Sequence, residues 1–308
     1  MNTLKFLSKS LRFYSYRLNR EHTANFISIK KIIPDYQNLE TQCNCYLENL
    51  KLNDPIAPIT NITTKVSDIS PKSMIPVYKR HVLLIDETSS SKQAHMNWQS
   101  KLEDNDESVY PYGILKRIKE KNLQLMKQQN EECLPILMNV IELVNIAEDP
   151  VSAQDSTKTG KKYKLLCLPE WKVLSFDENS IEQVSDLVNK SNLSEHFEHL
   201  DNNKIKLSTF HEDNLLLICG HNQRDTRCGV MAKELITKMK SNDPVGFISH
   251  IGGHKFAGNI ILYKQQKHET NSYWFRHINP LVADEVLEQA KKGIMVSEFY
   301  RGSASFKN

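Results

Sequence analysis

The chain has 308 residues, a formal net charge of +3, 39% hydrophobic residues and 25% charged residues. These values are typical of a folded globular protein with one large domain or two ordinary ones. They argue against a disordered or fibrous protein, and the small net charge gives no indication of nucleic-acid binding. No apolar run approaches the roughly eighteen residues that a membrane span needs, so we expect none.

The first twenty residues are basic, with five lysines or arginines and no acidic residue before Glu21. Leu4, Leu7 and Leu11 recur at helical spacing, which predicts an apolar stripe opposite a basic face. With serines interspersed, this is the composition of a mitochondrial transit peptide. We therefore expect residues 1–30 to form a mitochondrial targeting segment of a protein in the matrix or the intermembrane space. The alternative is an ordinary basic helix of the fold.

The N-terminal half, residues 31–204, is predicted to be an α/β domain. Residues 31–80 show little periodicity, and residues 148–162 form a polar loop. The predicted strands are 81–86, 134–143, 163–169 and 171–176, and the predicted helices are 113–129 and 180–189. Ser180 is the expected N-cap of the second helix, with Gln183 as its capping-box partner.

The C-terminal part, residues 205–308, is the most regular stretch. Apolar runs predict strands at 214–220, 245–250 and 259–264 and an extended piece at 272–278, with helices at about 229–240 and 282–292. This order is typical of a small α/β layer with helices packed on a sheet.

Six cysteines at irregular spacing do not make a secreted disulfide scaffold. Cys133 and Cys167 lie in apolar runs and are expected in the core. Cys43 and Cys45 form a C-x-C pair, which could bind a metal, exchange disulfides or do neither.

Two cysteines and two histidines follow the predicted strands of the C-terminal part. Cys219 ends one strand and Cys228 begins the next helix. His250 ends the following strand, and His254 lies in the glycine-rich turn after it. If these strands are parallel neighbours, all four side chains lie at one sheet edge. The set suits zinc or an iron-sulfur cluster, but eight residues between the cysteines exceed the usual spacing of about two to four in structural zinc sites. Cys219 and His221 form a C-x-H, yet the later C-x-x-H of a Rieske centre is absent.

The stretches "CGHNQRDTRCG" and "HIGGHKFAGNIILY" resemble the sucrase/ferredoxin-like family of fungal proteins, in particular its mitochondrial branch. The resemblance is specific over residues 215–263 and looser from residue 78 to the C-terminus. It implies that residues 205–308 form a thioredoxin-like ferredoxin domain active in electron transfer or thiol redox control. Our own interpretation of the N-terminal half is a second, degenerate thioredoxin-like domain, although its periodicity is weak. No sucrase-type carboxylate pair is identifiable.

The same resemblance implies a [2Fe-2S] cluster, held by Cys219, Cys228, His250 and His254. Neighbouring residues also have expected roles, each with a plainer alternative. Arg224 and Arg227 could favour thiolates and the reduced cluster, or be solvated, and Lys255 could steer an acidic partner or face water. Gly252, Gly253 and Gly258 are expected at tight turns or close approaches, and His221 is an alternative ligand to His250.

Three functional classes remain open from the sequence. The first is a mitochondrial iron-sulfur protein, an electron carrier or an oxidoreductase, that docks redox protein partners. The second is a thiol-disulfide oxidoreductase using Cys219 with Cys228, or Cys43 with Cys45, although the chain contains no C-x-x-C. The third is a zinc-stabilised interaction module. Neither a nucleotide-binding glycine loop nor a G-x-S-x-G elbow supports a kinase or a hydrolase.

Overall fold

The computed structural model describes residues 25–36, 75–87, 95, 98–128, 135–144, 160–190, 193–197, 204–223, 225–253, 256–267 and 269–307. The predicted targeting segment up to residue 24, the Cys43 and Cys45 pair, Cys133 and most of the predicted polar loop lie outside these ranges. In the described part of the chain, no helix is long and apolar enough to cross a membrane.

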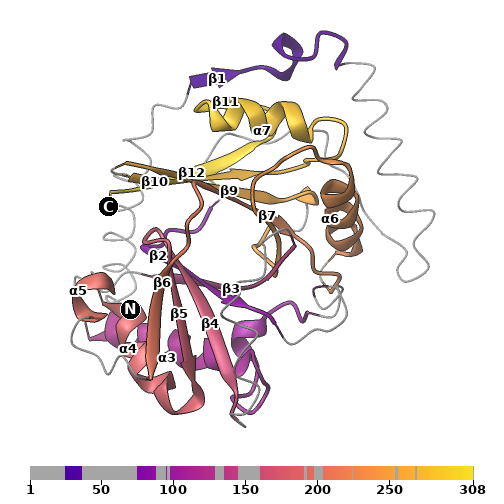
Figure 1. Cartoon of the computed structure of the whole chain (residues 1–308). Helices are drawn as coiled ribbons and strands as arrows, with labels where there is room; N and C mark the ends of the chain where they lie inside the picture. Colours follow the sequence, from indigo (N-terminus) through magenta and orange to yellow (C-terminus); the bar gives the residue numbers. More distant parts are fainter. Residues whose placement is uncertain are drawn as a thin grey trace, which may run out of the picture.

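A ten-stranded sheet organises the molecule (Figure 1). Five strands of this sheet and the helices beside them are here called the N-terminal wing. In chain order they are β2 (Arg80–Ile85), α3 (Gly113–Lys127), β3 (Ile136–Leu143), β4 (Lys162–Leu168), β5 (Lys172–Asp177), α4 (Ile181–Asn189), α5 (Leu193–Phe197) and β6 (Ile205–Thr209). The other half, the C-terminal wing, consists of β7 (Asn214–Cys219), α6 (Thr226–Lys238), β8 (Val245–Ile248), β9 (Ile260–Gln266), β10 (Glu269–Phe275), α7 (Ala283–Lys291) and β12 (Tyr300–Lys307). Short 3-10 turns add η4 (Leu102–Asp104) and η5 (Glu178–Ser180).

The strand order is β12-β10-β9-β7-β8-β3-β2-β4-β5-β6. Within this sheet the parallel pairs are β2 with β3 and β7 with β8, and the other neighbours are antiparallel. The fold is therefore a mixed α/β fold with a mostly antiparallel sheet. This agrees with the predicted α/β class, and the predicted strands at 81–86, 134–143, 163–169, 171–176, 214–220, 245–250 and 259–264 are all confirmed within a few residues.

The two wings repeat one topology. Each has a strand, a helix, a parallel strand, two antiparallel strands and a second helix, and the orders β5-β4-β2-β3 and β10-β9-β7-β8 correspond. The register at the junction has the same symmetry, because Ile141 of β3 lies opposite Ile248 of β8. Asp86 N–H donates to the carbonyl of Ile141, and Gly220 N–H donates to that of Ile248. A pseudo-twofold axis thus passes between the two isoleucines.

The sheet folds over so that its wings face each other. Strands β2 and β10 are five steps apart in the sheet, which would be ~24 Å if it were flat. Yet the hydroxyl of Tyr78, just before β2, lies 2.9 Å from that of Ser272 on β10. Apolar side chains of both wings fill the space between them, and the helices cover the outer faces.

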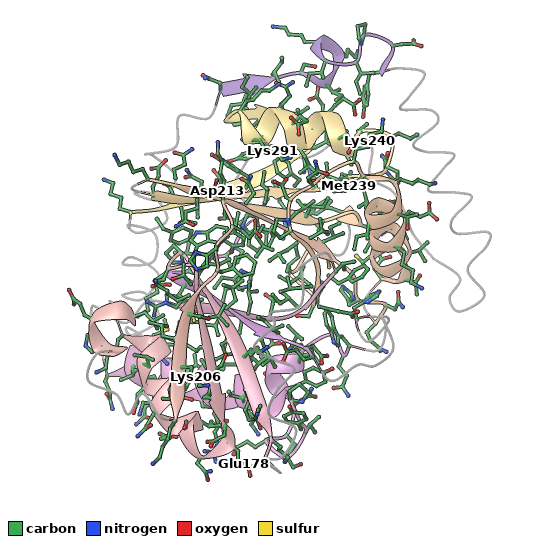
Figure 2. The ribbon with its side chains drawn as sticks, viewed as in Figure 1. Glu178, Lys206, Asp213, Met239, Lys240 and Lys291 are labelled. Carbon is green, nitrogen blue, oxygen red and sulfur yellow. The ribbon has the colours of Figure 1, made fainter. Side chains whose placement is uncertain are left out.

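Polar contacts also hold the outer side of the C-terminal wing. Figure 2 labels Lys291 of α7 and Lys240, which follows α6. The Nζ of Lys291 lies 2.8 Å from Oδ2 of Asp243, and the N–H of Lys240 donates to Asp284. These contacts fix α7 to the connection between α6 and β8.

A short clip lies beyond α7. The strand β1 (Asn25–Ile27) pairs in parallel with β11 (Ile294–Val296), and η1 (Ile29–Lys31) follows it (Figure 1). The side chain of Ile29 is fully buried there. Strand β1 and Ile29, within the segment predicted to be a targeting sequence, thus belong to the fold through the pairing with β11 and the burial of Ile29.

Two local details differ from the predictions. Ser180 is the N-cap residue of α4, as predicted, but its side chain makes no capping hydrogen bond, because its hydroxyl donates to the carboxylate of Asp177, which caps η5. Helix α6 begins at Thr226 rather than near residue 229, because Asp225 caps it by accepting the N–H of Arg227.

The predicted division into domains at residues 204 and 205 stays a prediction. Strand β6 begins at residue 205 and pairs with β5 of the N-terminal wing, and one sheet runs through both wings.

Candidate metal centre

The candidate site lies where two parallel strands end. Cys219 is the last residue of β7 and lies opposite Ile248, the last residue of β8. The residues that follow both strands therefore reach the same edge, as the sequence predicted. Cys228 reaches this edge from the first turn of α6, and both cysteine side chains are buried.

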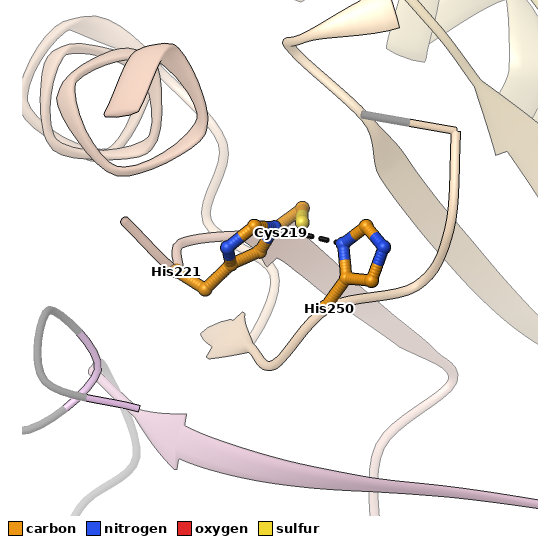
Figure 3. A group of neighbouring side chains, drawn as sticks. All are labelled: Cys219, His221 and His250. Atoms are coloured by element: carbon orange, nitrogen blue, oxygen red, sulfur yellow. Dashed lines mark hydrogen bonds between the residues drawn. The ribbon is translucent and has the colours of Figure 1, made fainter. Parts of the chain in front are cut away.

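Cys219, His221 and His250 form a compact group of donor atoms. One donor atom from each lies within 4.8 Å of the others, so the group could hold a metal ion. Figure 3 shows the Cys219 sulfur beside the two imidazole rings, which stand at 82° to each other. Nδ1 of His250 lies 2.8 Å from Nε2 of His221, so one ring donates a hydrogen to the other. His221, which the sequence offered only as an alternative ligand, is fully buried at the centre of the site.

The two sulfurs are neighbours and influence each other's protonation. A hydrogen bond from Cys228 holds the pKa of the Cys219 thiol well below its usual value, and His221 and His250 act in the same direction against the effect of burial. The same hydrogen bond, together with burial, holds the pKa of Cys228 well above its usual value. This pair therefore favours a thiolate at Cys219. No cysteine in the described ranges forms a disulfide, and Cys167 is buried in the core as predicted.

Positive charge reaches the site from a buried arginine of α6. Arg227 donates to both carboxylate oxygens of Asp225, at 2.9 and 2.5 Å, and its side chain is only 8% exposed. The predicted alternative of a solvated loop arginine is wrong, because Arg227 belongs to a helix and is buried in an ion pair. Its charge lowers the pKa of Cys228, although this is the smallest of the effects on that thiol.

The glycines after His250 lie where a larger residue would strain the backbone or collide with neighbouring atoms. Gly252 and Gly253 have φ values of 73° and 68°. A Cβ on Gly253 would lie 2.8 Å from the guanidinium carbon of Arg301, and a Cβ on Gly258 would lie 2.2 Å from the carbonyl oxygen of Ile278. The close backbone approach that the sequence predicted is confirmed at Gly253 and Gly258. Arg301 is a site neighbour that the sequence analysis missed.

A second set of neighbours comes from the N-terminal wing. Asn139 of β3 donates to the carbonyl of His250 at 3.1 Å and to the hydroxyl of Ser249 at 2.9 Å. The Oδ1 of Asn139 accepts a hydrogen bond from Nε2 of His81 at 2.9 Å. The segment that carries His250 is thus fixed by side chains from the opposite wing.

Three residues of the predicted site environment, Arg224, His254 and Lys255, lie outside the described residues. Of the predicted ligands, the structure brings Cys219, Cys228 and His250 together and adds His221 to them. Two thiols with imidazoles are a donor set that suits zinc and iron-sulfur centres. The residues present therefore fit the group that the sequence implied.

Comparison with known proteins places the chain. Residues 71–302 match the model of the family described as sucrase/ferredoxin-like. Three similar proteins, each named altered inheritance of mitochondria protein 32, come from Candida glabrata, Eremothecium gossypii and Saccharomyces cerevisiae strain YJM789.

These relatives are similar over nearly their whole length. The C. glabrata protein is 27% identical over 85% of this chain and 88% of its own length. The E. gossypii protein is 28% identical over 86% of this chain and 90% of its own length. The S. cerevisiae protein is 25% identical over 94% of this chain and 96% of its own length. No solved structure matches the chain significantly. The family model covers most of the chain and includes both cysteines and the histidines of the site, so this protein belongs to the sucrase/ferredoxin-like family.

Proposed function

We propose that this protein is a mitochondrial [2Fe-2S] protein that acts in electron transfer or thiol redox control. The cluster ligands in this proposal are Cys219, Cys228, His250 and His254. The observation that carries it is the meeting of two buried sulfurs and the His250 ring at the ends of β7 and β8. When bound, such a cluster supplies one-electron transfer at a potential that imidazole ligands raise.

The residues of this chain would prepare the site for such a group. The Cys219 thiol, with its lowered pKa, already favours the thiolate that binds iron. The ring of His221 orients that of His250 through their mutual hydrogen bond, as partners of metal-binding histidines commonly do. Burial of Cys219 and Cys228 excludes water from the sulfurs.

A thioredoxin-like scaffold in each wing is part of the proposal. Supporting it, each wing has a parallel β-α-β unit followed by two antiparallel strands and a helix, with the same strand order. The N-terminal wing has Ile85 and Asp86 where the C-terminal wing has Cys219 and Gly220, because the two strand registers correspond. This agrees with a first unit that lacks the cluster ligands.

The mitochondrial location is consistent with the name of the similar proteins, altered inheritance of mitochondria protein 32. The basic and acid-free first twenty residues point the same way.

A dithiol oxidoreductase is the second candidate, and the contact between Cys219 and Cys228 favours it. Thiol exchange would use the lower-pKa Cys219 as the attacking sulfur. Burial weighs against it, because the side chains of Cys219 and Cys228 are 1% and 0% exposed and an incoming disulfide would have to reach their sulfurs.

A zinc module is the third candidate and is favoured by the three-donor group Cys219, His221 and His250.

The test is anaerobic reconstitution of the full chain with iron and sulfide, followed by metal analysis and ultraviolet-visible and electron paramagnetic resonance spectra. We expect about two irons and two sulfides per chain, and their loss in Cys219→Ala and Cys228→Ala. Cys167→Ala is the matched control, because Cys167 is equally buried but lies in the N-terminal wing. A colourless protein with one bound zinc would replace this proposal with the zinc module, and one with a Cys219–Cys228 disulfide would replace it with the dithiol enzyme.

A further inference from the structure

Arg301 places a buried guanidinium beside the candidate site from the far end of the chain. It lies on β12 and is only 6% exposed. Its guanidinium carbon lies 5.4 Å from the ring centre of Trp274 on β10, the neighbouring strand. A cation stacked on an aromatic face and shielded from water is held in a defined position.

This guanidinium supports the loop that follows His250. Its Nη1 donates to the carbonyl oxygen of Gly252 at 3.3 Å and to Oδ1 of Asn259 at 3.2 Å. Gly253 lies so close that a Cβ there would come within 2.8 Å of the guanidinium carbon. The two consecutive glycines therefore let the loop pass directly over Arg301.

Asn259 extends the same support to the strand that carries Cys219. Its backbone carbonyl accepts the N–H of Cys219 at 3.0 Å, and its side-chain amide donates to the carbonyl of Gly253 at 3.0 Å. Asn259 is fully buried. Through it, Arg301 contacts both the end of β7 and the loop after β8, and these two segments carry the proposed ligands Cys219 and His250.

The charge of Arg301 also acts on the sulfurs. Burial lowers the pKa of its guanidinium to about 10; attraction to Cys219 and Cys228 opposes that shift, and repulsion from Arg276 adds to it. The neighbouring Arg276 differs in this respect, because burial alone accounts for its lowered pKa. Arg276 lies over the ring of Phe256 at 5.7 Å.

We propose that Arg301 is the positioning residue of the site: it ties the end of β7 to the loop after His250 and supplies the buried positive charge that favours the reduced state of the bound cluster. The inference rests on the proposed function. Reduction adds one electron, from dithionite in the experiment below, and forms or breaks no bond to the protein. The centre gains one negative charge, and a fixed positive charge nearby makes this gain more favourable.

The experiment measures the midpoint potential of the reconstituted full chain for the wild type, Arg301→Gln, Arg301→Lys and Arg276→Gln. Glutamine removes the charge, whereas lysine keeps it but lacks the planar guanidinium whose Nη1 donates to both Gly252 and Asn259. Arg276→Gln is the matched control, because Arg276 is a buried arginine that directly follows the adjacent strand β10. Hydrogen exchange of the Cys219 amide in the metal-free protein reports the positioning role separately.

We expect Arg301→Gln to lower the ratio of reduced to oxidised cluster at least tenfold at a fixed potential, which is about 59 mV for one electron. Arg301→Lys should stay within threefold of the wild type, and Arg276→Gln should shift less than Arg301→Gln. The Cys219 amide should exchange faster in both Arg301 variants and not in Arg276→Gln.

An unchanged ratio in Arg301→Gln with a bound cluster would overturn the inference and leave the proposed function standing. If Arg301→Gln binds no cluster, Arg301→Lys tests the role of the charge instead. A tenfold lower ratio of reduced to oxidised cluster in Arg301→Lys, which keeps the charge, would exclude that role. Unchanged exchange of the Cys219 amide in both Arg301 variants would remove the positioning role. A wild type that takes up no cluster overturns the proposed function and this inference together.

Discussion

The phenol oxygen of Tyr263 lies 2.7 Å from Nδ1 of His81, and this contact joins the two wings of the sheet. His81 passes the connection on through Nε2 to Asn139, which contacts Ser249 and the carbonyl of His250. On the other side, Tyr263 meets Tyr78 at 3.0 Å. All of these side chains are buried, so a continuous polar network crosses the interior from one wing to the segment that carries His250.

The protonation of His81 links this network to the stability of the protein at acidic pH, which can therefore be used to test the network. Burial lowers its pKa to about 3, against the effect of its hydrogen bond to Asn139. The unfolded chain, with a histidine pKa of about 6.5, binds more protons than the folded chain between these values. Stability is therefore lost as the pH falls from about 6.5 toward 3, by up to ~2 kcal/mol between pH 7 and pH 5. His81→Gln should remove this part of the pH dependence while lowering stability at pH 7.

Urea unfolding at pH 7 and pH 5 measures the difference. The control is His211→Gln, because His211 is exposed on the surface and should leave the pH dependence unchanged. His277, whose pKa burial lowers to about 4, contributes a similar term that stays in both variants. An equal loss of stability between the two pH values in His81→Gln and the wild type would show that His81 is not buried in its neutral form.

The two histidines that touch in the site should differ in their effect on iron. In the proposed set His250 is a ligand, whereas His221 orients it through the 2.8 Å contact between their rings. We expect His250→Ala to alter the spectrum and iron content, and His221→Ala to keep about two irons with affinity reduced roughly 10–100-fold, the usual cost of losing an orienting partner. Iron titration and electron paramagnetic resonance distinguish the two. Loss of the cluster signal in His221→Ala, with an intact signal in His250→Ala, would make His221 the ligand.

Gly258 should be the least replaceable of the glycines with positive φ. Its φ is 86°, and a Cβ there would lie 2.2 Å from the carbonyl oxygen and 2.9 Å from the nitrogen of Ile278, both of which are backbone atoms. Gly293 has a φ of 78°, but a Cβ there would meet nothing within 4 Å. We expect Gly293→Ala to cost about 1–2 kcal/mol from backbone strain alone, and Gly258→Ala clearly more. Equal midpoints of urea unfolding for the two variants would contradict the close approach to Ile278.

Much of the fold could be predicted because its strands are short apolar runs with clear ends. The stretches before Asp86 and Gly220 became β2 and β7. Cys219 at the end of β7 and His250 after β8 come together because these strands are parallel neighbours. Local sequence cannot show which distant strands pair. The contacts of Arg301 with Gly252 and Asn259 depend on β12, about fifty residues further along, lying next to β10.

The same limit explains the other omissions. Nothing near Asn139 in the sequence indicates that it contacts His250, because the contact depends on the antiparallel pairing of β3 with β8. His221 could be identified only as part of a C-x-H, since its burial follows from the way the segment after β7 turns toward His250. The missing capping hydrogen bond of Ser180 has a local cause, because its hydroxyl donates to Asp177 instead.

The clip formed by β1 and η1 leads to the last prediction. Glu298 accepts hydrogen bonds from the hydroxyl of Ser28 at 2.6 Å and from the N–H of Ile29 at 3.1 Å. Burial raises the pKa of Glu298, but these hydrogen bonds outweigh it and hold the pKa below its usual value. Its contribution to stability is therefore present above the unfolded pKa of about 4.3 and lost as the pH falls through the lower folded pKa.

We expect Ile29→Ala to cost about 2–5 kcal/mol, as for other buried large-to-small substitutions, whereas Lys30→Ala, at an exposed position, should stay within about 0.5 kcal/mol. Glu298→Gln should weaken the clip at pH 7 and reduce the loss of stability on acidification.

If a targeting segment is removed in mitochondria, the cut should fall before Asn25, because β1 and Ile29 belong to the folded protein. Mass spectrometry of the mature N-terminus measures this directly, and a cut after Ile29 together with a neutral Ile29→Ala would show that the clip does not contribute to the mature protein.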